Sequence, residues 1–417
     1  MSLNNFFTVG TEAPRFSCLI ATCKTWPATT VQPALLSAAG ARVSALSPGP
    51  LLWSSHVAER IKGPRDPISA AVQLRALLDE RTFDWVIVAD DDLLRAVLEV
   101  TDRNKLSRWF PFNPLDDVAL GVLTSKYGFA LHAPAAGIPV PESFVVDSVA
   151  AAASQAEIFG YPVVLKGRQG FSGSDVNVVA DKAALLRASA QHIERYGRVL
   201  VQRHVVGINV SASILYHRGT LSGYKAYRAE CCYPNDTSAS TVHEFFDHPS
   251  LDAIVRAVGT LTGFHGMLGI DFVYEEKTGT LYAIEINPRP TIGFAGARAN
   301  VAYFSPLVTK FFEDESGPGI AYAGADRLQS YFPNYLMYYV SRADKHDPQT
   351  TRRLKASFGE YRADEWRLAA WQLLRFARDC FRDVFHLGPV KGAARNGIRA
   401  NGSTQSHLAR EYTGTSS

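Results

Sequence analysis

The sequence has little that would place it among membrane, secreted or nucleic-acid-binding proteins. No apolar run reaches the roughly 18 residues that a membrane span requires, and the start, MSLNNFFTVGTEAPRF, lacks the basic and then apolar pattern of a signal peptide. The 43 basic and 40 acidic residues leave a net charge of only +3, which argues against a nucleic-acid binder. We therefore expect a cytoplasmic location and small-molecule partners, with nucleic acid absent and membrane contact not favoured.

Cysteine is also scarce. The 417 residues contain five cysteines, an odd number that includes the adjacent pair Cys231 and Cys232. Their positions match neither a disulfide framework nor a zinc site, and the eleven histidines show no ligand spacing either. We interpret the cysteines as buried thiols in a reducing compartment.

Short apolar runs alternate with helical patterns in the first hundred residues. FSCLIATC, ARVSALS and FDWVIVADDD predict buried strands, while Asp66 and Pro67 predict the start of a helix between the last two. This alternation indicates a small parallel α/β domain.

From Asn113 onward the pattern changes to helices and antiparallel hairpins. One predicted hairpin, YPVVLKGRQGFSGSDVNVVAD, has a long glycine-rich connection, and a second is GIDFVYEEKTGTLYAIEINP. Near the C-terminus we expect an aromatic-rich, arginine-rich helix from about Asp364 to Phe385. Such helices usually dock onto their own protein, although a homodimer interface or a membrane surface is the alternative.

The second hairpin carries the strongest chemical signal. The chain should turn near 276–279, which places Asp271 about opposite Glu285, with Asn287 on the same face. Facing carboxylates repel unless a cation lies between them, and oxygen ligands suit a hard ion such as Mg²⁺. The opposite, apolar face is then expected to hold Ile270, Phe272, Tyr274, Tyr282, Ile284 and Ile286.

A solvated polar face is the alternative interpretation of this hairpin. It would be preferred for an isolated Asp and Glu pair, but the continuation EINPRP favours a metal site.

The glycine-rich connection is the second signal. Glycines let backbone N–H groups approach an anion, Ser172 and Ser174 can donate further hydrogen bonds, and Lys166 adds a positive charge. A mobile surface loop of similar composition is about equally compatible with this pattern. The loop is not a P-loop, because no GK followed by Ser or Thr occurs and a strand follows the glycines.

Taken in order, these motifs resemble an ATP-grasp domain. They are a helix with Lys126, then GIPVPES, YPVVLKGRQGFSGSDVNVV, VLVQRHVVGINVSAS, GIDFV and AIEINPRP. The resemblance covers roughly 113–312, and the α/β segment before it resembles the preATP-grasp domain of the carbamoyl-phosphate synthase and biotin carboxylase branch.

The resemblance implies a domain organisation. A preATP-grasp α/β domain is expected at 1–112, followed by a two-lobed ATP-grasp domain and a helical C-terminal extension. The ranges are 113–200 for the glycine-rich lobe, 201–312 for the metal-binding lobe, 313–390 for the extension and 391–417 for a disordered tail.

The resemblance also implies roles for individual residues. Metal ligands would be Asp271, Glu285 and Asn287, and Arg289 would be catalytic, with Lys225 and Arg228 as weaker catalytic candidates that could equally be exposed strand charges. ATP would be contacted by Lys126, Lys166, Gly170, Ser172, Gly173, Ser174, Gln202, Val205 and Asn209. Two of these positions depart from the family pattern, since Gln202 stands where a Glu often binds adenine and Asn209 where an acidic residue usually binds ribose.

The implied activity is that of a carboxylate–amine ligase. It would use ATP and Mg²⁺, with Mn²⁺ as a substitute, to form an acyl phosphate that an amine then attacks. The alternatives are phosphoryl transfer of the kinase or carboxylase type without an amide product, and a nucleotide-binding protein without catalysis. The intact Asp271, Glu285, Asn287 and Arg289 favour an enzyme.

Overall fold

The structure, a computed structural model, describes residues 14–102, 105–106, 116–169, 175–232, 240–294, 298–313, 319–322, 328–341, 348–359 and 363–384. The chain divides into two compact units, 1–378 and 379–417. The second unit contributes to the described residues only the end of helix α14 (Trp366–Val384). None of the described helices is long and apolar enough to cross a membrane.

The first unit begins with a parallel α/β region, residues 14–102, which we call the N-terminal region. Its sheet has the order β3-β2-β1-β4. The strands are β1 (Phe16–Ala21), β2 (Ala41–Ser47), β3 (Val57–Lys62) and β4 (Trp85–Val88). The helices are α1 (Pro27–Thr30), α2 (Gln32–Ala38), η1 (Pro50–Trp53), α3 (Pro67–Glu80) and α4 (Asp91–Val100). The three predicted strands and the Asp66 cap of α3 are confirmed.

Sequence analysis did not anticipate the edge strand β3. Its sequence VAERIK alternates buried and exposed positions, and its charged side chains are consistent with an edge strand. Glu59 on this strand pairs with Arg81 at 2.6 Å.

The strand order reverses between β1 and β4, and at such a switch point the carboxyl ends of parallel strands commonly bind ligands. Asp90 follows β4 here and is completely buried. It accepts hydrogen bonds from Leu93 N at 2.8 Å, which caps α4, from Cys23 N at 2.9 Å and from Thr22 Oγ1 at 2.8 Å. One carboxylate thus ties the loop after β1 to the start of α4.

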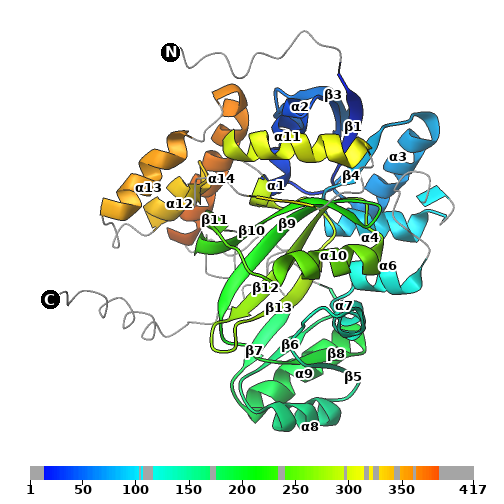
Figure 1. The fold of residues 1–417 in the computed structure, drawn as a ribbon, viewed down its shortest axis with the longest axis vertical. Helices are drawn as coiled ribbons and strands as arrows, with labels where there is room; N and C mark the ends of the chain where they lie inside the picture. Colours follow the sequence, from blue (N-terminus) through cyan, green and yellow to red (C-terminus); the bar gives the residue numbers. More distant parts are fainter. Residues whose placement is uncertain are drawn as a thin grey trace. The chain divides into compact units, whose positions relative to one another are not determined.

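A small antiparallel sheet follows, which forms the lower lobe in Figure 1 and is called the small lobe below. Its order is β5-β8-β6-β7. Its strands are β5 (Ser143–Val146), β6 (Val163–Lys166), β7 (Val176–Val179) and β8 (Val199–Arg203), and its helices are α8 (Val149–Phe159) and α9 (Lys182–Tyr196). The helices pack with the side of the sheet that carries Val163, Leu165 and Val201. Strand alternation therefore places Lys166 and Gln202 on the opposite side.

The centre of the first unit is a seven-stranded sheet of order β13-β12-β9-β10-β11-β15, with β14 beside β10. We call it the large sheet. Its strands are β9 (Ile208–His217), β10 (Thr220–Cys232), β11 (Ser240–Phe245), β12 (Gly266–Glu275), β13 (Thr280–Asn287), β14 (Ile320–Ala321) and β15 (Leu328–Ser330). The flanking helices include α6 (Asp117–Thr124), α7 (Lys126–His132), η2 (Pro134–Ala136), α10 (Leu251–Thr262), η3 (Ile292–Phe294) and α11 (Arg298–Glu313). One face of the sheet forms a core with side chains of α6, α7 and α10.

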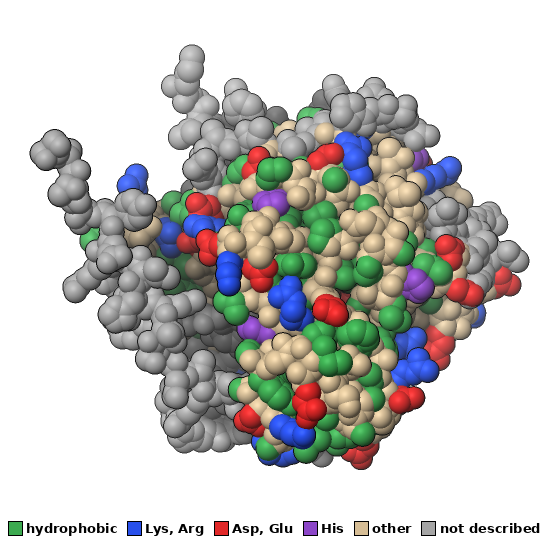
Figure 2. Space-filling model, turned by 60° about the horizontal axis from the view of Figure 1, so that its bottom comes forward, with side chains coloured by type: hydrophobic (Ala, Val, Ile, Leu, Met, Phe, Trp, Pro, Cys, Tyr) green, Lys and Arg blue, Asp and Glu red, His purple; other side chains and the backbone are tan. Residues whose placement is uncertain are grey.

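The predicted helical extension contains helices and also supplies the strands β14 and β15 to the large sheet. Its helical elements are α12 (Asn334–Ser341), α13 (Pro348–Gly359), η5 (Ala363–Glu365) and α14. The fold is therefore the expected mixture of an α/β region, a two-lobed domain and helices. On the face drawn in Figure 2, acidic and basic side chains of the described residues intermingle, as the small net charge predicts.

The hairpin of β12 and β13, called the acidic hairpin below, corrects one detail of the sequence analysis. Phe272 pairs with Ala283 although Asp271 pairs with Glu285, so Ile284 is an extra residue in a β-bulge. Because of this extra residue, the side chains of β13 that precede Ile284 point to the opposite faces from those predicted. Consequently Leu281 and Ala283 join Ile286 in the core, whereas Tyr282 and Ile284 are only partly buried.

The buried cap at Asp90 generates a stability prediction. Asp90→Ala leaves two backbone N–H groups and the Thr22 hydroxyl without their acceptor, so we expect unfolding to become easier by about 3 kcal/mol. Urea unfolding would measure this. Asp66→Ala is the matched control, because Asp66 caps α3 through Ser69 N at 2.8 Å but is exposed; equal effects of the two substitutions would refute a special role for Asp90.

Candidate active site

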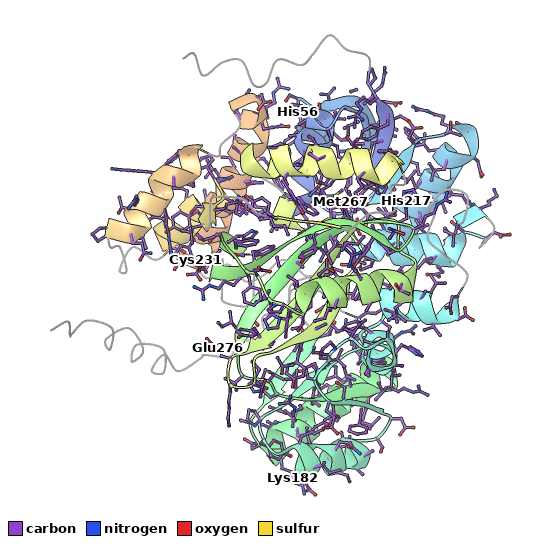
Figure 3. The ribbon with its side chains drawn as sticks, in the orientation of Figure 1. His56, Lys182, His217, Cys231, Met267 and Glu276 are labelled. Atoms are coloured by element: carbon purple, nitrogen blue, oxygen red, sulfur yellow. The ribbon has the colours of Figure 1, made fainter. Side chains whose placement is uncertain are left out.

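The centre of the candidate site is the carboxylate pair of the acidic hairpin. Asp271 and Glu285 are direct partners across the two strands, which confirms the predicted register. Both oxygens of Asp271 are held by neighbours: Ser211 Oγ donates to Oδ1 at 2.6 Å and Asn287 Nδ2 donates to Oδ2 at 2.9 Å. In Figure 3 the labels of Met267 and Glu276 mark the two ends of the hairpin's first strand, β12. By sequence, Asp271 lies midway along this strand.

Glu285 is paired with Lys126, the first residue of α7. Lys126 Nζ donates to Glu285 Oε1 at 2.7 Å. The helix start is fixed by Ser125, whose hydroxyl accepts hydrogen bonds from Tyr127 N and Gly128 N. Burial nevertheless raises the pKa of Glu285 above its ordinary value, and Asp271 adds to this increase while Lys126 opposes it. Burial is the largest of these effects, so the ionised form of Glu285 is less favoured here than in water.

Lys166 approaches the same hairpin from the small lobe. Its side chain is almost completely buried, and Nζ donates to the carbonyl oxygen of Ile284 at 3.1 Å. Burial lowers the pKa of Lys166 from 10.5 to about 8, although the charges of Glu285 and Asp271 oppose the change. Two lysines from different elements thus flank the carboxylate pair.

Arg289 connects this site to the N-terminal region. Its NH2 donates to Asn287 Oδ1 at 3.0 Å, and its Nε donates to Asp91 Oδ2 at 2.9 Å. The guanidinium also lies 4.7 Å from the ring centre of Trp26. Sequence analysis missed Asp91 and Trp26. The acidic run after the third predicted strand was the available signal, because ligands gather at the carboxyl ends of strands at a switch point.

A hollow opens beside the carboxylate pair, between α4, the α6–α7 turn and the end of β13. Charged side chains of both signs line it, and they include Asp91, Arg95, Lys126, Arg168 and Glu285. Phosphates and carboxylates need cations, and a metal ion needs anions, so this lining can accept both kinds of group.

The predicted nucleotide contacts are distributed over both lobes. Gln202 is buried on the same side of the small sheet as Lys166, and Val205 is buried just after β8. Asn209 is exposed on β9, and strand alternation places it on the face of the large sheet that carries Ser211 and Asp271. Four further candidates, Gly170, Ser172, Gly173 and Ser174, lie outside the described residues.

Two predicted catalytic residues are placed elsewhere. Arg228 is in register with Val210, which packs into the core, so it lies on the face opposite Asp271; it pairs with Glu244 at 2.5 Å and with Glu230 at 2.8 Å. Lys225 lies on the face of Asp271, but it is buried and donates to Gln329 Oε1 at 2.5 Å. The structure therefore corrects the expectation that Arg228 points into the site, and it gives Lys225 a partner at the far edge of the sheet.

The donor set fits a hard cation that is only partly ligated by protein. No group of three or more His, Cys, Asp or Glu side chains within the described ranges could hold a metal ion. Two partly buried carboxylates with an amide side chain beside them match the way Mg²⁺ binds through one or two carboxylates, waters and phosphates.

Comparison with known proteins shows which families and folds this chain resembles. The profile of the ATP-grasp domain family matches residues 124–293. Carbamoyl-phosphate synthase of Methanobrevibacter smithii is 25% identical over 142 residues, which cover 31% of this chain and 36% of that protein. The matched segment is thus little more than a third of that relative.

Two solved structures share the fold. The biotin carboxylase domain dimer of Hydrogenobacter thermophilus 2-oxoglutarate carboxylase, in complex with MgADP, ADP and bicarbonate, has a TM-score of 0.55 at 14% identity, with 76% of this chain and 74% of that chain covered. N5-carboxyaminoimidazole synthetase of Staphylococcus aureus with ADP has a TM-score of 0.54 at 16% identity, with 76% and 82% covered. The matched segment 124–293 resembles an ATP-grasp domain and contains Lys126, Lys166, Asp271, Glu285 and Arg289.

Proposed function

We propose that this protein uses ATP and Mg²⁺ to convert a carboxylate into an acyl phosphate, which an amine then attacks to form a C–N bond. The observation that carries the proposal is the partly buried pair Asp271 and Glu285, which lies between Lys126 and Lys166. A structural hairpin gains nothing from bringing two carboxylates face to face, whereas a metal and phosphate site uses them.

The two lobes would hold the nucleotide between them. Lys166 and Lys126 would contact phosphates, since both lie next to the carboxylate pair. Gln202 would meet the adenine amino group. Ser143 Oγ donates to Pro141 O at 2.6 Å, so it must accept from Gln202 Nε2 at 2.8 Å, and this leaves Gln202 Oε1 as the acceptor. Asn209 would lie near the ribose.

Asp271, Glu285 and Asn287 would hold Mg²⁺, with Mn²⁺ as a substitute. When bound, the ion would neutralise charge on the transferring phosphates. The hydrogen bonds from Ser211 and Asn287 orient Asp271 before any ligand arrives. Such orientation by neighbouring donors is typical of functional metal ligands.

The protein would further contribute by orienting the substrates and by stabilising the charge that develops during the reaction. The carboxylate oxygen of the substrate attacks the γ-phosphorus, ADP leaves, and the amine then displaces phosphate from the acyl group. The cations Lys126, Lys166 and Arg289 would offset the negative charge that develops on the phosphoryl oxygens. Because this chemistry depends on orientation and charge, no nucleophilic side chain of the protein is required.

Phosphoryl transfer of the kinase or carboxylase type is the second candidate, because relatives with this fold include a biotin carboxylase domain complexed with bicarbonate. Phosphate release from ATP, measured with pooled amino acids, other carboxylates or bicarbonate, tests both candidates. Mass spectrometry should show ADP and a new amide if the ligase proposal holds. ADP without an amide would favour the second candidate, and AMP would contradict the acyl phosphate mechanism.

Glu285→Gln tests the metal site. The substitution removes one proposed anionic ligand and relieves a partly buried charge of a group whose pKa is already raised. We expect unchanged or slightly higher thermal stability without nucleotide, loss of the added stability that Mg²⁺ and ATP confer, and at least a ~10²-fold lower turnover. Melting curves with and without MgATP, together with phosphate release, would measure these effects.

Glu276→Gln is the matched control, because Glu276 lies at the exposed tip of the same hairpin (Figure 3). It should behave like the unmodified protein. A Glu285→Gln protein that is stabilised by MgATP as strongly as this control would remove Glu285 from the metal site.

The lowered pKa of Lys166 generates a pH prediction. Between about 8 and 10.5 the unfolded chain keeps a proton on Lys166 that the folded chain has lost, so stability without nucleotide should rise with pH in this window. ATP phosphates favour the charged form, so MgATP affinity should instead fall above about pH 8, by up to about tenfold per pH unit.

Calorimetric titration from pH 7 to 9.5 would measure this effect. Lys166→Met should bind MgATP weakly and without this pH dependence. Lys182→Met serves as the control, since Lys182 is exposed at the start of α9 and pairs with Glu157. An unchanged pH profile in Lys166→Met would mean that another group titrates.

A further inference from the structure

Arg289 is linked to Asp271, one of the proposed metal-binding carboxylates, through a single intervening side chain, Asn287. Its guanidinium donates to Asn287 Oδ1 at 3.0 Å, and Asn287 Nδ2 donates to Asp271 Oδ2 at 2.9 Å. Lys126 already pairs with Glu285 at 2.7 Å. If Arg289 paired directly with Asp271, both proposed carboxylate ligands would be neutralised by side chains of the protein itself.

Asp91 of the N-terminal region holds Arg289 in its observed position. Asp91 Oδ2 accepts from Arg289 Nε at 2.9 Å, and both side chains are largely buried, with 18% and 15% exposed. A partly buried ion pair of this kind is screened less than a surface pair, so it can compete with Asp271 for the guanidinium. The Trp26 ring, 4.7 Å from the guanidinium, favours the same position.

The position of Asp91 is itself fixed. It is the first residue of α4, directly after the buried cap Asp90, whose hydrogen bonds with Leu93, Cys23 and Thr22 join the start of the helix to the loop after β1. The hydrogen bonds of Asp90 therefore fix the start of α4, and with it the position of the Asp91 carboxylate that accepts from Arg289.

We propose that Asp91 is a positioning residue that acts through Arg289: it retains the guanidinium beside the N-terminal region and so keeps Asp271 available for a divalent cation. This inference rests on the proposed function. It gives the N-terminal region a direct part in metal binding, because the counter-ion comes from α4 while the metal ligands come from β12 and β13.

Asp92 offers a matched comparison. It is the next residue of the same helix turn, carries the same charge and is similarly exposed, but it pairs with Lys24 at 2.5 Å and with Arg95, not with Arg289. If Asp91 acted only through local negative charge or helix stability, Asp92→Asn would have an equal effect.

The experiment is a titration with Mg²⁺ at a fixed concentration of a non-hydrolysable ATP analogue. Calorimetry and thermal melting measure binding at each Mg²⁺ concentration. It compares the unmodified chain with Asp91→Asn, Asp92→Asn, Arg289→Gln and the double variant Asp91→Asn/Arg289→Gln. We expect Asp91→Asn to raise the Mg²⁺ concentration at half-saturation by roughly tenfold, as for other partners of metal ligands. Asp92→Asn should remain within about twofold of the unmodified chain.

The double variant decides whether Asp91 acts through Arg289. If it does, Asp91→Asn has no further effect once Arg289 is replaced, and the double variant matches Arg289→Gln. An effect of Asp91→Asn that persists in the double variant, or one that Asp92→Asn equals, overturns the inference. The inference is also overturned if Asp91→Asn and the unmodified chain reach half-saturation at the same Mg²⁺ concentration.

These results are distinguishable from a failure of the proposed function. If the unmodified chain binds the analogue in an Mg²⁺-dependent way, the proposed function stands, and only the comparison of variants decides the inference. If it shows no Mg²⁺-dependent binding, both are overturned. Melting without ligand confirms that each variant is folded. If Asp91→Asn alone is less stable, the comparison of Arg289→Gln with the double variant still decides whether Asp91 acts through Arg289.

Discussion

The repulsion between two facing, partly buried carboxylates is the constraint on which the rest of the site depends. Asp271 and Glu285 face each other because β12 and β13 pair in that register, and the surrounding groups limit the resulting charge. Lys126 comes from the start of α7 and Lys166 from the small lobe. Two elements that are distant in sequence from the acidic hairpin thus converge on the carboxylate pair, and each supplies a positive charge.

Much of this centre was predictable because it depends on local rules. Strand alternation and a short turn were enough to predict that Asp271 lies opposite Glu285, and the order of motifs was enough to predict the ATP-grasp fold. The bulge at Ile284 was not predictable, since the alternation of apolar residues does not show which strand carries an extra residue. It changed the core positions on β13 but left the carboxylate register intact.

The contribution of the N-terminal region could not be derived from local rules. Asp91 and Arg289 are 198 residues apart in sequence, and only the reversal of strand order between β1 and β4 brings the start of α4 to the acidic hairpin. Similarly, the charges of Lys225 and Arg228 suggested substrate contacts, but strand pairing decides their faces. Arg228 meets Glu244 on the face opposite Asp271, while Lys225 meets Gln329 on the edge strand β15.

The departures from the family pattern acquire a physical meaning in the structure. The amide of Gln202 is oriented by Ser143, whose own proton is donated to Pro141 O, so Oε1 presents an acceptor as a carboxylate would, but without its charge. Asn209, which is exposed on the carboxylate face, likewise offers polar atoms without charge. In the proposed nucleotide site, fewer anions would then oppose the phosphates, and recognition would depend more on the hydrogen bonds that these amides make. The charges needed for the proposed chemistry are concentrated at the acidic hairpin, where a metal ion, the lysines and the arginine would balance them.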